Sequence, residues 1–323
     1  MSVAQGAVRP KKTKRSLRWQ KLGAVAGLVL LIVVFSTATP SFLQVNNLLN
    51  IALQTSVIAI IAIGQSYVII TEGIDLSVGS VAALAGVITA DLLVADVPIP
   101  VAIIAGLLGG ALCGLINGVL VTYGNIPPFI ATLGMLGIAR GAVLVVTNGK
   151  PVSGVPREFS WIGNGNVLGV PFPVILMVVI AAIFGYVLVK SRFGRSVFAI
   201  GSNEKTAYLS GLNVARAKIG AYVLSGFLAG VAGVVLTSRL ISAAPTAGEG
   251  YELDSIAATV IGGASLSGGV GGITGTLIGA FVMGVLRNGL NLLGVSYYWQ
   301  QIAIGVVIVG AVFLDGLRRR RAR

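Results

Sequence analysis

The chain has 323 residues, of which 55% are hydrophobic and 10% are charged, and its mean hydropathy is +0.95. A typical globular protein carries about 25% charged residues. A single water-soluble core is therefore excluded, and the composition predicts an all-α polytopic membrane protein. A single cysteine, Cys113, and the lack of histidine exclude an internal disulfide, a cysteine-cluster metal site and His-ligated zinc.

The net charge of +13 comes mainly from three short basic segments. Segments 9–21, 190–218 and 318–323 contain seven, six and five of the 23 lysines and arginines. Basic segments of membrane proteins stay in the cytoplasm, where they face anionic lipid headgroups. The charge pattern therefore predicts contact with membrane lipids and no nucleic-acid partner.

Nine stretches are apolar enough and long enough for a membrane-spanning helix, which needs about 20 residues. In chain order they are 22–39, 48–71, 76–95, 99–122, 126–147, 171–189, 217–238, 270–292 and 299–316. A tenth stretch, 253–268, is short and rich in glycine.

The basic segments decide whether the tenth stretch crosses the membrane. Six predicted spans separate the N-terminal basic segment from 190–218, so both lie on one side. The basic C-terminus lies on that side only if 253–268 also crosses. The sequence therefore predicts ten spans and cytoplasmic termini, with basic tails 1–21 and 318–323 around a transmembrane domain, 22–317.

Six polar residues in or beside the predicted spans are candidates for the lining of a solute path, because polar groups in hydrocarbon are costly and usually functional. They are Gln65, Glu72, Asp75, Asn117, Arg140 and Asn288. The alternative for Arg140 is a paired structural cation. For Glu72 and Asp75 the alternative is an ordinary helix-end loop.

Glycines recur every four residues along two of the predicted spans, which favours close packing between helices. The two rows are Gly106, Gly110, Gly114 and Gly118, and Gly271, Gly275 and Gly279. Asn117-Gly118 and Asn288-Gly289 end glycine-rich spans on opposite membrane faces in the predicted topology. This pair suggests an inverted repeat, which is common in transporters.

The basic segment 190–218 contains a short capped helix. Asn203 suits an N-cap, Glu204 lies in the first turn and Gly211 suits the C-terminal stop. A helix of about two turns is marginal in water, so a partner or the flanking spans must brace it. Tyr208 and Leu209 suit an apolar groove on a partner. The alternative is an amphipathic loop resting on lipid headgroups.

No nucleotide-binding loop is present in the chain. The Walker pattern requires a glycine, four residues and then Gly-Lys-Ser/Thr. Gly149-Lys150 is followed by Pro151 and lacks the first glycine. If the protein uses ATP, another chain must bind it, and no cofactor is expected here.

Several runs of residues resemble the permease subunits of ribose-type ATP-binding cassette (ABC) sugar importers, the family that includes ribose, xylose and galactose systems. The resemblance extends from about Asn46 to Asp315. It rests on the runs 71–79, 129–135 with Arg140-Gly141, 147–152, 201–212, 251–258 and 275–280. Permeases for branched-chain amino acids and nucleosides look like more distant relatives.

The resemblance implies a homodimeric permease in the bacterial cytoplasmic membrane, a transport subunit rather than an enzyme. It also implies an extracytoplasmic sugar-binding protein and a cytoplasmic ATPase that docks on a coupling helix at 203–211. The residues expected to contact that ATPase are Asn203, Glu204, Lys205, Thr206, Tyr208 and Leu209.

The leading hypothesis is import of a ribose-like monosaccharide. Two alternatives belong to other classes: an ion-coupled secondary transporter that uses Glu72, Asp75 or Glu252, and a membrane scaffold or receptor with basic tails. An ABC permease for another small polar solute is a further alternative.

Overall fold

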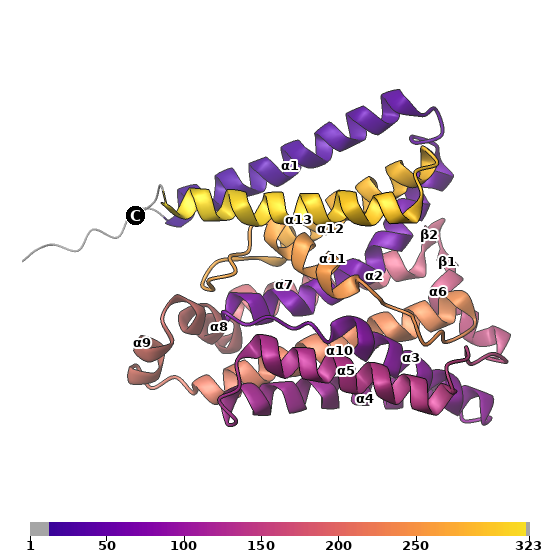
Figure 1. Ribbon diagram of the computed structural model, residues 1–323, viewed down its shortest axis with the longest axis horizontal. Helices are drawn as coiled ribbons and strands as arrows, with labels where there is room; N and C mark the ends of the chain where they lie inside the picture. The colour runs from indigo at the N-terminus through magenta and orange to yellow at the C-terminus, as the bar shows by residue number, and fades with distance from the viewer. Residues whose placement is uncertain (1–12, 321–323) are drawn as a thin grey trace, which may run out of the picture.

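The structure is a computed structural model that describes residues 13–320. Most of the predicted N-terminal tail, 1–21, and the last three residues of the tail 318–323 lie outside the described residues. Ten helices overlap the ten predicted stretches in chain order (Figure 1). They are α1 (Thr13–Ala38), α2 (Val45–Ile70), α3 (Val78–Val94), α4 (Ile99–Thr122), α5 (Pro128–Thr147), α7 (Phe172–Lys190), α10 (Val214–Leu240), α11 (Tyr251–Ile261), α12 (Ile273–Leu292) and α13 (Tyr297–Arg320).

Six of these helices are long and apolar enough to cross a membrane: α2, α4, α5, α7, α10 and α12. Two shorter apolar helical stretches, Gly23–Ala38 and Val78–Val94, accompany them. The prediction of an all-α polytopic membrane protein is confirmed. The small β1–β2 hairpin (Asn166–Val167 and Val170–Pro171) pairs Val167 with Val170 around a tight turn.

Local sequence explains where several helices begin and end. Each of α4, α5 and α7 has a proline at its first or second position. An N–H at these positions forms no hydrogen bond within the helix, so the proline costs none. After α5, Asn148 takes a left-handed conformation with φ 49° and stops the helix.

Helices α2 and α10 form the centre of the bundle, and α3, α4, α7, α11 and α12 pack against one or both of them (Figure 1). Helices α1, α5 and α13 pack on the outside of this group. The apolar part of α2 is 89% buried. The first predicted glycine row lets α4 approach its neighbours: a Cβ on Gly110 would lie 2.5 Å from the Gly226 carbonyl oxygen of α10. The second row does the same between α12 and α11, since a Cβ on Gly279 would overlap the Ala258 carbonyl oxygen. The close packing predicted from the two rows is confirmed.

Helix α11 is shorter than the predicted stretch 253–268. It has 11 residues, about 16 Å at 1.5 Å per residue, whereas the hydrocarbon core is about 30 Å thick. It ends at Ile261 because six of the next 11 residues, 262–272, are glycines. The prediction of a helix over the whole stretch is wrong.

The chain before α3 is also non-helical. Residues 71–77 leave the end of α2 and run back along the bundle to the start of α3 (Figure 1). Helices α3 and α11 are therefore each continued by a non-helical segment: 71–77 precedes α3, and 262–272 follows α11.

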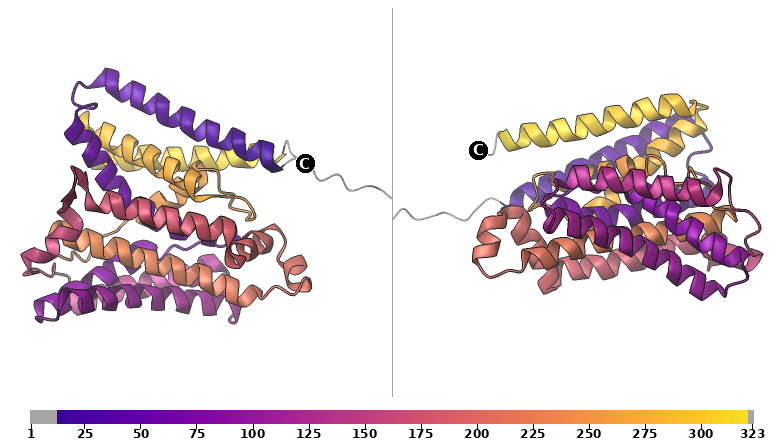
Figure 2. Two further views of the ribbon diagram at one scale, coloured as in Figure 1. Left: turned by 180° about the vertical axis from the view of Figure 1, so that it is seen from behind. Right: turned by 60° about the horizontal axis from the view of Figure 1, so that its bottom comes forward.

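One end of the bundle gathers the start of α1, the end of α13 and the short helices α8 (Arg192–Ser202) and α9 (Glu204–Leu209), as the views in Figures 1 and 2 agree. The opposite end carries the β1–β2 hairpin, η1 (Arg157–Ser160) and α6 (Trp161–Asn164). We call these the α9 end and the hairpin end.

Candidate functional site

Helix α9 forms where the sequence predicts a short capped helix. Asn203 Oδ1 accepts a hydrogen bond of 2.8 Å from the Thr206 amide, as an N-cap residue does. Gly211 follows with φ +80°, a conformation that glycine adopts without strain. The preceding helix, α8, was not predicted; Ser191 caps it by accepting from the Gly194 amide at 3.0 Å.

The flanking elements brace α9. Ala207 is buried in a small cluster with Ile200 of α8 and Ala217 of α10. Lys218 of α10 donates to the Glu204 carboxylate at 2.6 Å. A six-residue helix is therefore held in place by its neighbours in the chain, as its length requires.

The outer side of α9 is open. Tyr208 and Leu209 are 69% and 74% exposed, and Lys205 and Thr206 are exposed as well. A cavity of about 580 Å³ runs beside them, lined by Tyr208, Leu209, Gly211, Leu212, Asn213, Val214 and Ala215. Of the six predicted coupling residues, Asn203 and Glu204 form contacts that hold α9 in place, and the other four are exposed on its outer side.

The base of α8 lies directly on the end of α2. A Cβ on Gly201 would overlap the Ile70 carbonyl oxygen, so only glycine fits there. The same carbonyl accepts a hydrogen bond of 2.9 Å from the amide of Gly269, in the segment that follows α11. The α8–α9 unit, the end of α2 and the segment 262–272 therefore meet at one point.

Three of the predicted path residues meet in the interior of the bundle: Gln65, Asp75 and Asn117, all at most 1% exposed. Asp75 accepts hydrogen bonds from the Ser77 hydroxyl at 2.6 Å and the Ser225 hydroxyl at 2.8 Å. Asn117 donates to the Ser77 hydroxyl at 2.9 Å. With its amide turned so that both atoms are satisfied, Gln65 pairs with the backbone N–H and C=O of Asp75 at 3.2 Å each.

This polar cluster joins the extended segment 71–77 to α2, α4 and α10. The backbone of a non-helical segment inside a membrane protein needs such partners, because no water is present to satisfy it. The cluster is buried within one copy of the chain, so its direct chemical effect is to fix the segment.

The other three predicted path residues lie elsewhere. Glu72 is exposed at the end of α2, in a left-handed conformation with φ 66°. Arg140 of α5 donates to the carbonyl oxygens of Pro245 and Ala247, and so fastens the loop between α10 and α11. This contact agrees with the alternative of a paired structural cation.

Asn288 pairs with Asn47 through two reciprocal amide hydrogen bonds of 2.9 and 3.0 Å. The pair joins α12 to the first turn of α2, whereas Gln65 of the polar cluster lies near the other end of α2. The structure therefore separates Asn288 from the residues with which the sequence grouped it.

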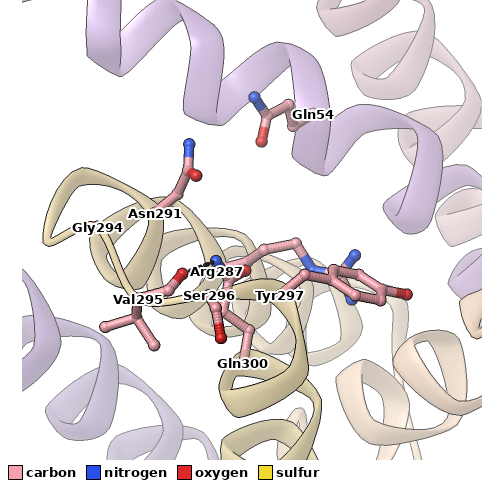
Figure 3. A pocket seen from close by; sticks show the side chains of 8 residues that line it. All are labelled: Gln54, Arg287, Asn291, Gly294, Val295, Ser296, Tyr297 and Gln300. Atoms are coloured by element: carbon pink, nitrogen blue, oxygen red, sulfur yellow. Dashed lines mark hydrogen bonds between the residues drawn. The ribbon is translucent and has the colours of Figure 1, made fainter.

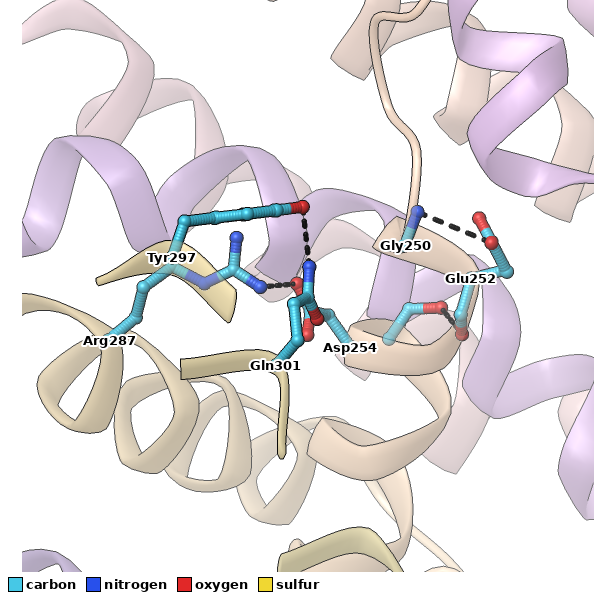
Figure 4. A network of polar contacts seen from close by, with 7 residues as sticks. Gly250, Glu252, Asp254, Arg287, Tyr297 and Gln301 are labelled. Atoms are coloured by element: carbon cyan, nitrogen blue, oxygen red, sulfur yellow. Dashed lines mark hydrogen bonds and ion pairs between the residues drawn. The ribbon is translucent and has the colours of Figure 1, made fainter. Parts of the chain in front are cut away.

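Some polar partners escaped the sequence reasoning. Ser225 gives no sequence signal, because a single serine in a membrane helix is common. Asp254 of α11 was not among the candidate residues, yet it is 2% exposed and accepts a hydrogen bond of 2.7 Å from Arg287 of α12 (Figure 4). Its place inside the predicted stretch 253–268 would have been the signal, because a carboxylate in a membrane span is costly without a partner.

A second cavity lies at the hairpin end, between α2, the end of α12 and the start of α13 (Figure 3). Its volume is about 450 Å³, and its lining is mostly polar: Gln54, Arg287, Asn291, Gly294, Val295, Ser296, Tyr297 and Gln300.

Comparisons with known proteins identify the kind of membrane protein. Residues 47–312 match the family described as the branched-chain amino acid transport system / permease component. No solved structure matches the chain significantly.

Curated relatives match over nearly their whole length. The ribose import permease protein RbsC of Bacillus subtilis (strain 168) is 50% identical over 92% of each chain. Its counterpart in Escherichia coli (strain K12) is 49% identical over 95% of this chain and 96% of its own. The D-allose transport system permease protein AlsC of the same strain is 39% identical over 98% and 97%. The chain thus belongs to the family of transport-system permease components and is a multi-pass membrane transport subunit rather than an enzyme.

Proposed function

We propose that this chain is the permease subunit of an ATP-driven ABC importer for ribose or a closely related monosaccharide. The observation that carries the proposal is the match of about half of all residues to ribose import permeases over more than nine-tenths of both chains. The D-allose permease, another monosaccharide permease by name, is less similar at 39% identity.

The energy source is a separate ATPase that docks on α9. Three features support this assignment: the chain has no Walker motif, α9 is braced by its own neighbours, and Tyr208 and Leu209 are exposed. An aromatic and an aliphatic side chain beside an open groove are typical anchors of a protein interface. Movement of α9 would reach the interior through Gly201, Ile70 and Gly269.

The chain crosses the cytoplasmic membrane of a bacterium ten times, with the α9 end in the cytoplasm. The basic residues of 190–218 support this orientation. In this arrangement the segment 71–77 with α3, and the loop before α11 with α11, each make one crossing. The exposed apolar side chains of α4, such as Ile104, Leu108 and Leu112, face lipid or a second copy of the chain.

Two copies form the working permease, and the extracytoplasmic sugar-binding protein docks at the hairpin end. The buried cluster of Gln65, Asp75 and Asn117 acts as a positioning element for the segment 71–77, beside the solute path rather than in contact with the sugar. Arg140 positions the loop before α11 in the same way.

The test is reconstitution of the chain in proteoliposomes with its ATPase and binding protein. We expect D-ribose uptake that requires ATP hydrolysis and is unaffected by a protonophore. Uptake that persists without the ATPase and stops with the protonophore would instead identify an ion-coupled transporter. If the importer takes up another solute but no D-ribose, the proposed substrate is wrong, while the proposed ATP-driven permease stands.

A further inference from the structure

The cavity at the hairpin end has the size and the chemistry of a small-molecule site. Its volume of about 450 Å³ falls within the range of roughly 300–1,000 Å³ that is usual for ligand sites. Polar side chains come from three separate elements: Gln54 from α2, Asn291 from α12 and Gln300 from α13. They converge on one space between these three helices.

The cavity has no net charge. Arg287 is the one cation among the described lining residues. Its charge is neutralised by the Asp254 carboxylate, which lies 2.7 Å from the guanidinium (Figure 4). Asp254 is 2% exposed and is not among the lining residues, so the pair presents guanidinium N–H groups but not a free positive charge. Such a lining suits an uncharged ligand better than an anion.

Several lining groups are available to a ligand. Among the described residues, the side chains of Gln54, Asn291 and Ser296 form no hydrogen bond to another residue of the chain. Figure 3 shows the amides of Gln54 and Asn291 on opposite sides of the opening. By contrast, Gln300 donates to the Val295 carbonyl at 2.8 Å and so holds the turn between α12 and α13 in shape. The amides and the hydroxyl offer both donors and acceptors, as a polyhydroxy compound requires.

We propose that this cavity is a low-affinity site for an uncharged monosaccharide, which occupies it after leaving the binding protein and before entering the path across the membrane. The inference rests on the proposed function and extends it by naming residues that contact the sugar. The site is open and its ligand bonds replace bonds to water, so it holds the sugar only briefly.

The test uses the complete importer in proteoliposomes, with Gln54→Leu and Asn291→Leu as separate variants. Leucine has nearly the volume of these side chains and forms no hydrogen bonds. We expect the KM for D-ribose uptake to rise, or the uptake rate to fall, by about tenfold, the effect of one or two lost hydrogen bonds. Co-purification with the ATPase stays at the wild-type level, because α9 lies at the opposite end of the bundle.

The matched control is Asn46→Leu, an exposed polar residue of α2 that does not line the cavity. Its uptake should equal that of the wild type. Uptake by Gln54→Leu and Asn291→Leu that matches the control would overturn the proposed site, while the proposed function would stand.

A second measurement does not depend on transport. Ser296→Cys, in a chain with Cys113→Ala, places a thiol in the cavity, and millimolar D-ribose should slow its reaction with a maleimide. D-Ribose 5-phosphate should protect less, because the cavity is neutral. Equal reaction rates with and without D-ribose, or stronger protection by the phosphate ester, would refute the site. If the wild-type importer moves no monosaccharide, the proposed function fails first and this inference fails with it.

Discussion

At the scale of single residues, Asp75 is a buried carboxylate that forms no ion pair within residues 13–320. Its oxygens are satisfied by the hydroxyls of Ser77 and Ser225 and by the Ser77 amide. Hydroxyl donors can hold a carboxylate in place only if all of them remain, because an unsatisfied buried charge is costly. The side chain therefore depends on a residue of α10.

Ser225→Ala should destabilise the protein by about 1–3 kcal/mol, the cost of a buried acceptor oxygen that loses its donor. The measurement is thermal unfolding in detergent. Ser196→Ala is the control, because the Ser196 hydroxyl bonds only within its own helix, to the Arg192 carbonyl, in an exposed hydrogen bond. Its effect should stay within about 0.5 kcal/mol. Equal midpoints for the two variants would show that the Ser225 bond contributes nothing.

Glu204 and Tyr208 allow the two roles of α9 residues to be separated. The Glu204 side chain is 52% exposed and pairs with Lys218, and such a pair contributes about 0–1 kcal/mol. Glu204→Gln should therefore leave the melting temperature nearly unchanged. If its carboxylate only braces α9, uptake should also remain near the wild-type level.

Tyr208→Ala should reduce ATP-driven uptake by about tenfold or more, since a buried interface tyrosine commonly contributes 2 kcal/mol or more. The isolated permease should melt at the wild-type temperature, because Tyr208 is 69% exposed. Co-purification with the ATPase provides the readout. If Tyr208→Ala co-purifies with the ATPase and takes up sugar as the wild type does, α9 is not the docking site.

At the scale of elements, the sequence was sufficient to predict those whose cause is local. The residues that begin and end α9, Asn203 and Gly211, lie within two residues of the helix in the chain, and the long apolar runs give the six long spans. Helix α8 was missed because 190–218 was treated as a charged loop, although Ser191 supplies a cap. The end of α11 was missed because a count of apolar residues does not penalise glycine. Glycine is nevertheless unfavourable inside a helix.

Because α8 contacts α2 at Gly201, we expect that adding one methyl group at this position will strongly reduce coupling. Gly201→Ala would push α8 away from the Ile70 carbonyl, an overpacking that costs about 1–3 kcal/mol. ATP hydrolysis should continue while uptake falls, because α9 loses its link to the interior. Measuring both rates in proteoliposomes separates this result from simple unfolding.

Gly137→Ala is the matched control for Gly201→Ala. Gly137 lies in α5, and a Cβ there would have no atom within 4 Å. Alanine also favours a helix over glycine by about 1 kcal/mol. Normal uptake is expected in the control, and normal coupling in Gly201→Ala would contradict the link.

At the scale of the whole molecule, the basic segments predict that both chain ends lie on the cytoplasmic side, and that side of the membrane stays a prediction. The start of α1, the end of α13 and the α8–α9 unit lie together (Figure 2), as the charge pattern indicates. The interior was harder, because it depends on pairs far apart in the chain. Ser225 lies 150 residues from Asp75 and Asn288 lies 241 residues from Asn47, and nothing in a single sequence links them.

Cysteine labelling tests the proposed orientation in intact cells. In a chain with Cys113→Ala, Leu168→Cys at the hairpin end should react with an impermeant maleimide, because Leu168 is 100% exposed. Lys205→Cys on α9 should react only after the membrane is permeabilised. The reverse pattern would place the α9 end outside and rule out a cytoplasmic ATPase partner there.

The hydrogen bond from Ser225 to Asp75 also has a consequence for biosynthesis. Ribosomes add about 5–20 residues per second, so the 150 residues between the partners take roughly 8–30 s to make. During that time the nascent chain holds a carboxylate whose final donor does not yet exist, and an unpaired carboxylate is costly in lipid. The segment around Asp75 therefore reaches its native position only after α10 has been inserted, which makes assembly of the first half of the permease wait for the second.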